Sequence, residues 1–202
     1  MKIGLLGGTF DPVHLAHLAV AEGVWTQLDL DRVTFIPAGE PWRKADHTIA
    51  GAEHRLAMLR LAVAGNDHFD ISLVEVERWG PSYTVDTLEA MHAGLPSGAE
   101  LFCILGRDAL FDLPNWKDPL RIVQLCRLAV VARPGYEERE LAELEVLAPG
   151  LLEHVIFVEA PLLDISSTDI RRRVREGLSI RYLVPDAVAA YISDHGLYRD
   201  DG

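Results

Sequence analysis

Short apolar runs alternate with longer amphipathic stretches along most of the chain, and this alternation constrains the fold more than any other feature. The apolar runs have the length and the β-branched content of strands. They cover residues 2–7, 32–38, 69–77, 100–106, 127–135 and 154–160. Strands that are apolar nearly throughout and are separated by helices predict a parallel sheet covered on both faces.

Helical periodicity fills the intervals between these runs and continues after the last of them. The expected helices cover residues 15–28, 52–64, 83–94, 138–147, 170–177 and 185–196. The pattern predicts one α/β domain over residues 1–202, a Rossmann-like, doubly wound parallel sheet with a helical C-terminal portion from about residue 165. Sheets of this kind bind ligands beyond the carboxyl ends of their strands, so functional residues are expected there.

The composition excludes several classes of function. A formal net charge of −12 argues against a surface that holds nucleic acid or an anionic membrane. No long apolar run of membrane-spanning length occurs, and glycines come too early at the N-terminus for a signal peptide, so a soluble cytoplasmic protein is expected. Cys103 and Cys126 lie in apolar runs without metal-ligand spacing, which indicates reduced core residues.

The segment GGTFDPVHLAH, residues 7–17, follows the first expected strand and opens the first long helix. Glycines let a backbone approach a ligand closely, and a helix N-terminus attracts anions. His14 and His17 are three positions apart and therefore share a helix face. A tight turn with solvated histidines would explain the same residues. A dinucleotide-binding fingerprint is disfavoured because the spacing G-x-G-x-x-G is absent.

Taken whole, this segment resembles the signature of the HxGH nucleotidyltransferases, which share an adenylate-binding fold with class I aminoacyl-tRNA synthetases. The resemblance implies that His14 and His17 stabilise a transferring phosphoryl group. It also implies ATP binding by the residues before them, namely Gly7, Gly8, Thr9 and Phe10. One departure is Ala16, which stands where the family usually has glycine and bears on the pose of the substrate.

A second segment, ISSTDIR, lies at another expected junction of strand and helix, residues 165–171, and resembles the family's ISSTxIR motif. Hydroxyl and N–H groups at a helix start can bind phosphates, and a guanidinium suits phosphate oxygens. The resemblance assigns ATP contacts to Ile165, Ser166, Ser167 and Thr168, and a catalytic role to Arg171. Helix capping by Ser166, Ser167 or Thr168 would account for the hydroxyls alone.

Three further segments resemble the nicotinate mononucleotide branch of the family. In SYTVDTL, residues 82–88, the likeness assigns Tyr83 and Thr84 to the pyridine carboxylate. An ordinary N-capped helix is the alternative. The likeness also assigns Gly106 and Asp108 to ATP and its ribose, and assigns Trp116 to stacking on the pyridine ring, which suits a flat indole.

The third segment combines PWRK, residues 41–44, with EHRLAML, residues 53–59. Residues 37–52 are rich in glycine, proline and charge, which predicts a mobile loop. Lys44 on this loop could move onto the phosphates as ATP binds, although Trp42 replaces the histidine that is common in the branch. Arg133, after an expected strand, is a further phosphate contact on the acceptor side.

The resemblance implies transfer of the adenylyl group of ATP to nicotinate mononucleotide, with Mg²⁺ accompanying ATP and no dedicated metal ligands on the chain. Alternatives are another phosphorylated acceptor, such as phosphopantetheine or nicotinamide mononucleotide, a cytidylyltransferase, and a non-catalytic nucleotide sensor. Neither a nucleic acid nor a membrane is an expected partner. The sequence leaves open a homo-oligomer and the preference between the acid and the amide form of the pyridine nucleotide.

Overall fold

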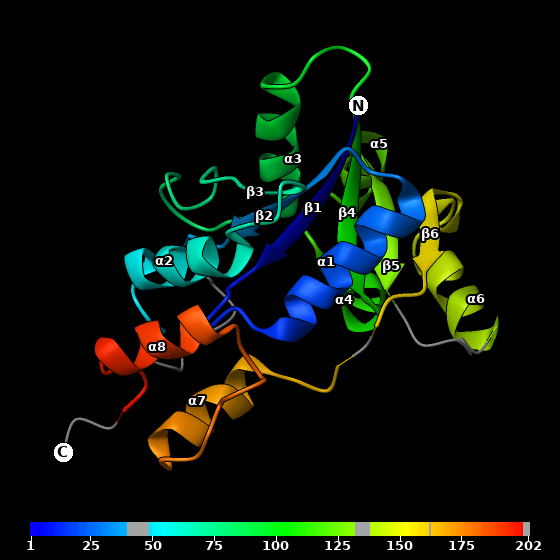
Figure 1. Ribbon diagram of the computed structural model, residues 1–202. Coiled ribbons are helices and arrows are strands. Elements are labelled where there is room, and N and C mark those ends of the chain that lie inside the picture. Colours follow the sequence, from blue (N-terminus) through cyan, green and yellow to red (C-terminus); the bar gives the residue numbers. More distant parts are fainter. Residues whose placement is uncertain (40–48, 132–137, 162, 200–202) are drawn as a thin grey trace.

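A computed structural model describes residues 1–39, 49–131, 138–161 and 163–199. The described residues form a parallel sheet of six strands in the order β3-β2-β1-β4-β5-β6 (Figure 1). The strands are β1 Lys2–Gly8, β2 Arg32–Pro37, β3 Phe69–Ile71, β4 Glu100–Gly106, β5 Arg127–Val131 and β6 Val155–Val158. The strand order reverses between β1 and β4, which is where a doubly wound sheet binds its ligand. The predicted fold class is confirmed.

The expected helices are all present. The longer ones are α1 Leu15–Leu28, α2 Ala52–Val63, α3 Thr84–Ala93, α6 Glu138–Leu147, α7 Ser167–Arg175 and α8 Asp186–Asp194. The segment after β4 also folds into short helices that the sequence pattern did not predict, namely α4 Arg107–Asp112, the 3₁₀ turn η2 Leu113–Asn115 and α5 Pro119–Leu125. Asp118 caps α5 by accepting the Arg121 N–H at 3.2 Å, and Pro119 occupies its first position. A further 3₁₀ turn, η3 Leu151–His154, precedes β6.

The strand expected over residues 69–77 is wrong in its second half. β3 ends at Ile71, and the chain then turns, with the Glu77 N–H bonded to the Leu73 carbonyl at 2.9 Å. The Glu75 carboxylate accepts the Thr87 hydroxyl at 2.7 Å, which ties this turn to α3. Glu75, expected within a strand, therefore lies in a turn that is anchored to α3.

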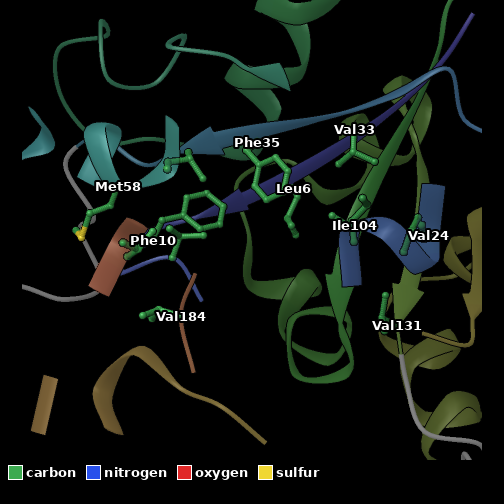
Figure 2. Packing of buried hydrophobic residues seen from close by; sticks show 14 of the residues in the cluster. Leu6, Phe10, Val24, Val33, Phe35, Met58, Ile104, Val131 and Val184 are labelled. Carbon is green, nitrogen blue, oxygen red and sulfur yellow. The ribbon is translucent and has the colours of Figure 1, made fainter. Parts of the chain in front are cut away.

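Alternate residues of each strand face opposite layers of helices. In β4, Phe102 and Ile104 face the cluster formed with α1, α2 and α8. Leu101 and Cys103 face the cluster formed with α3, α5 and α6. Figure 2 shows the first cluster from close by, with Phe10 lying between Met58 and Phe35.

α7 and α8 lie together at the end of the sheet toward which β1 runs (Figure 1). A backbone bond from the Leu15 N–H to the Leu183 carbonyl, 3.0 Å long, joins the start of α1 to the segment between these helices. The C-terminal part of the chain therefore borders the carboxyl end of β1. Within the described ranges, no helix has the length and apolar character needed to cross a membrane.

Candidate active site

The loop after β1 is shaped by Phe10. This residue has a φ of 49°, in the left-handed region, and its side chain is 1% exposed. Its ring packs against Phe35, with centroids 5.8 Å apart, and edge-on against His17 at 5.0 Å. A Cβ on Gly8 would lie 3.0 Å from the Phe10 ring, so glycine suits this close approach. Any contact of Phe10 with ATP would therefore come from its backbone.

The two motif histidines are stacked on each other. Their ring centroids are 3.6 Å apart, and the ring planes differ by 21°. His14 is the N-cap of α1, and its backbone N–H donates to Nδ1 of His17 at 3.2 Å. Because Nδ1 of His17 accepts this bond, the proton of the neutral His17 ring lies on Nε2. The fold thus fixes His17 as a donor through Nε2.

His14 is held in its neutral form by burial. Its side chain is 5% exposed, and desolvation lowers its pKa from 6.5 to about 4. Its Nδ1 atom is buried without a hydrogen-bond partner among the described residues. A neutral His14 can donate one hydrogen bond but adds no positive charge near neutral pH.

This burial makes stability depend on pH. Near pH 6.5 an unfolded chain gains a proton that the folded His14 does not accept until about pH 4. The stability tied to neutral His14 is therefore full above about pH 6.5 and is lost as the pH falls, by up to about 3 kcal/mol. Urea unfolding at about pH 7 and at about pH 4.5 measures how much free energy of unfolding each protein loses between the two pH values. His14→Gln is expected to lose about 2 kcal/mol less than the wild type. Equal losses in the two proteins would contradict this assignment.

The second motif meets the first directly. Ser166 is the N-cap of α7 and accepts the Asp169 N–H at 3.1 Å. Ser167 donates its hydroxyl to the Pro12 carbonyl at 2.9 Å. Nη1 of Arg171 donates to the Asp11 carbonyl at 2.7 Å, across 160 positions of sequence. The fold thus brings together the two segments that the sequence singled out.

A cavity of about 460 Å³ lies between the carboxyl ends of β1 and β4. Its lining combines residues from three of the predicted segments: Gly7, Gly8, Thr9, Thr84, Gly106 and Trp116. The Trp116 indole is held in place, because its Nε1 donates to Asp112 at 3.0 Å. The cavity occupies the point where the strand order reverses, as expected for a ligand site in this fold.

Several other predicted residues are not among those that line this cavity. Tyr83 is the N-cap of α3 and packs against the core, with Nζ of Lys117 4.8 Å from its ring centroid. Asp108 is exposed in the first turn of α4, and Ile165 is half-buried before α7. Thr168 is exposed and accepts a long bond of 3.4 Å from Arg171. Lys44 and Arg133 lie outside the described residues.

Four polar residues of this region were not predicted from the sequence, namely Asp11, Arg55, Glu75 and Tyr198. Glu75 lines the cavity, and burial raises the pKa of its carboxyl above the usual range. Asp11 and Arg55 lie inside the two motifs GGTFDPVHLAH and EHRLAML, so their place in these motifs could have indicated that they belong to the site. Only the folded structure connects Tyr198 to them, through its hydroxyl bond of 2.6 Å to Asp11.

The described side chains show no group of three or more histidines, cysteines or carboxylates placed to hold a metal ion. The polar groups that line the cavity are backbone amides, hydroxyls and the Glu75 carboxyl, and the adjoining motif segments contribute two imidazoles and the Arg171 guanidinium. These groups suit phosphate oxygens and a flat ring.

Comparisons with solved structures give the same fold. The nicotinic acid mononucleotide adenylyltransferase of Plasmodium falciparum complexed with NaAD superposes with a TM-score of 0.76 at 20% identity, covering 98% of this chain and 97% of that one. The same enzyme complexed with APC gives a TM-score of 0.75 at 19% identity, covering 98% and 96%. At these identities the likeness establishes the architecture alone.

Sequence comparisons identify the family as well as the fold. A family model described as cytidylyltransferase-like matches residues 5–173. The chain is 54% identical over 198 residues to a probable nicotinate-nucleotide adenylyltransferase of Roseiflexus sp. (strain RS-1), covering 98% of each. It is 46% identical to the protein of that name from Dehalococcoides mccartyi, covering 98% of this chain and 97% of the relative. Because these matches extend along nearly the whole sequence, the chain belongs to the cytidylyltransferase-like family and, within it, to the nicotinate-nucleotide adenylyltransferases.

Proposed function

We propose that the chain transfers the adenylyl group of ATP to nicotinate mononucleotide, giving deamido-NAD and pyrophosphate, in NAD biosynthesis. The observation that carries this proposal is the contact between the two motifs, in which Arg171 and Ser167 reach the loop that precedes His14. The adjoining cavity, with Trp116 in its lining, offers a place for a flat acceptor ring. The names of the curated relatives support the same reaction.

The acceptor phosphate is already an anion near neutral pH, so it can attack the α-phosphorus of ATP without a strong protein base. A bond forms between an acceptor phosphate oxygen and the α-phosphorus, and the bond from that phosphorus to the bridging β-phosphate oxygen breaks. Pyrophosphate leaves with the bonding electrons. No covalent bond to the enzyme is needed, and catalysis reduces to in-line positioning and neutralisation of charge.

Each proposed stabiliser supplies a different kind of contact. His17 donates through Nε2, and neutral His14 donates one hydrogen bond to a phosphate oxygen. Arg171 adds a planar charged donor for the phosphates of ATP. Gly7, Gly8 and Thr9 offer backbone groups at the rim of the cavity, and the start of α7 adds N–H groups and hydroxyls. Lys44 stays a proposed contact from the loop before α2.

Mg²⁺ enters this scheme with ATP, as part of the substrate. Its preferred ligands are oxygens, and triphosphate oxygens and water supply them without a cage of carboxylates. The ion would neutralise charge on the phosphates and on the departing pyrophosphate. A cytoplasmic location of the enzyme is part of the same proposal.

Pyrophosphate release tests the function directly. The purified chain is supplied with Mg²⁺ and ATP together with nicotinate mononucleotide, nicotinamide mononucleotide or phosphopantetheine, each in a separate reaction. CTP replaces ATP in a fourth reaction. Release with ATP and nicotinate mononucleotide, exceeding every other pair, is the expected result. Preference for another pair would reassign the substrate, and no release with any pair would favour a nucleotide sensor.

Trp116→Ala is expected to weaken acceptor binding by about 1–3 kcal/mol, because the pyridine ring loses its stacking partner. ATP binding should change little. Calorimetry with each ligand separately checks the difference. Trp79→Ala is the matched control, since Trp79 is 98% exposed and lies outside the cavity lining. Equal losses of affinity for ATP and acceptor would contradict the role of Trp116.

A further inference from the structure

Asp11 is a buried carboxylate in the loop between β1 and α1, residues 9–14. Asp11 is only 2% exposed to solvent. The Tyr198 hydroxyl donates to Oδ1 at 2.6 Å, and the Ala50 N–H approaches the same oxygen at 3.4 Å. Oδ2 lies 3.7 Å from Nη1 of Arg171. One oxygen of the Asp11 carboxylate therefore contacts the C-terminal segment through Tyr198, and the other faces Arg171 of α7.

Arg171 is held on this residue by a second contact. The same Nη1 atom donates to the Asp11 backbone carbonyl at 2.7 Å, and the Arg171 side chain is only 14% exposed. Its Nη2 atom makes a long bond of 3.4 Å to Thr168. One edge of the guanidinium is thus fixed against the loop, and among the described residues its remaining N–H groups have no other hydrogen-bond acceptor, so they can donate to phosphate oxygens.

The Tyr198 hydroxyl stays protonated in this position and can act as a hydrogen-bond donor. Burial raises the pKa of its phenol above the usual range, and the negative charge of Asp11 acts in the same direction. The positive charges of Arg171 and Arg55 oppose the shift without reversing it. Tyr198 therefore stays protonated near neutral pH and donates to the carboxylate without interruption.

We propose that Tyr198 and Asp11 are positioning residues for Arg171: the Tyr198 hydroxyl fixes the orientation of the Asp11 carboxylate, which in turn aims the guanidinium at the triphosphate. The proposal rests on the function proposed above. A carboxylate that accepts a short bond through Oδ1 cannot rotate freely, so Oδ2 keeps facing Arg171. A displacement of about 1 Å in a group that contacts the transition state costs up to about 100-fold in rate.

Tyr198→Phe removes the hydroxyl and keeps the ring. It is expected to lower kcat/KM for ATP by about 10-fold, as for the loss of one hydrogen bond to a charged group, and to change KM for the acceptor less than about twofold. Tyr191→Phe is the matched control. It removes a similar bond of 3.0 Å to His54, between α8 and α2, without touching Asp11. A purely structural role for Tyr198 would make the two variants alike in thermal stability and in kinetics.

A double-mutant cycle tests whether Tyr198 acts through Arg171. In an Arg171→Ala background, adding Tyr198→Phe is expected to change the dissociation constant of ATP less than about twofold, although it weakens binding in the wild-type background. Additive losses, or a Tyr198→Phe enzyme equal to the wild type, would overturn the proposal. Calorimetric ATP binding needs no acceptor. A wild-type chain that binds ATP without releasing pyrophosphate would therefore refute the proposed function while this cycle still decides the role of Tyr198.

Discussion

His17→Ala is expected to lower kcat by about 100-fold or more, because the variant loses the donor that we propose for the transferring phosphoryl group. The bond from the His14 N–H to Nδ1 holds the ring and leaves the proton on Nε2, so its geometry is set before substrate binds. An alanine cannot reproduce this donor. The KM values for both substrates should change much less than kcat, since the contact is assigned to the transition state.

Steady-state kinetics of pyrophosphate release check this expectation, together with thermal unfolding to show that the fold is retained. His68→Ala is the control, because His68 also stacks on an aromatic ring, that of Trp25, with centroids 3.9 Å apart. That variant should turn over at the normal rate. A His17→Ala enzyme with kcat within about threefold of the wild type would remove His17 from the mechanism.

Arg55→Met is expected to lower the free energy of unfolding by about 3–5 kcal/mol. The Arg55 side chain is 2% exposed and donates to three backbone carbonyls, those of Ala50, Thr9 and Gly39, at 2.9 to 3.1 Å. Burial lowers the pKa of its guanidinium, while the charge of Asp11 opposes the shift. A methionine fills similar space but leaves these part-buried carbonyls, and the buried surroundings of Arg55, without a donor.

Urea unfolding measures this loss, and Arg60→Met serves as the control on the same helix. Arg60 is exposed, so its replacement should change stability by less than about 0.5 kcal/mol. Because Arg55 bonds to the Thr9 carbonyl, the variant should also bind ATP more weakly under conditions in which it remains folded. Equal stability of the two variants would show that the Arg55 bonds contribute little.

Much of the fold could be predicted because its signals are local. The apolar runs of β1, β2 and β4 and the helical periodicity of α1 and α2 are contained in short windows of sequence. The prediction failed after Ile71, where the chain turns and the Glu75 carboxylate accepts the Thr87 hydroxyl. It also missed α4 and α5, which are too short to show a clear period.

The residues of the candidate site could likewise be predicted only where a local sequence motif contains them. His14, His17 and Arg171 could be proposed from the sequence because they belong to segments with a recognisable order of residues, and the structure brings those segments together. The contacts that support them could not, since Arg55 meets Thr9 across 46 positions and Tyr198 meets Asp11 across 187. No local pattern of sequence encodes which distant hydroxyl or guanidinium will satisfy a buried group. Such pairings follow only from the packing of α2 and α8 beside the loop.

The bond between Asp11 and Tyr198 also bears on the order of folding. Contacts between residues so far apart in the chain carry a large loop-closure entropy, and they form after nearer pairings have shortened the effective loop. The strands that flank β1 can pair before the C-terminal segment arrives. We therefore expect the loop between β1 and α1 to be secured late in folding, after the strands have paired and before the chain can bind a nucleotide.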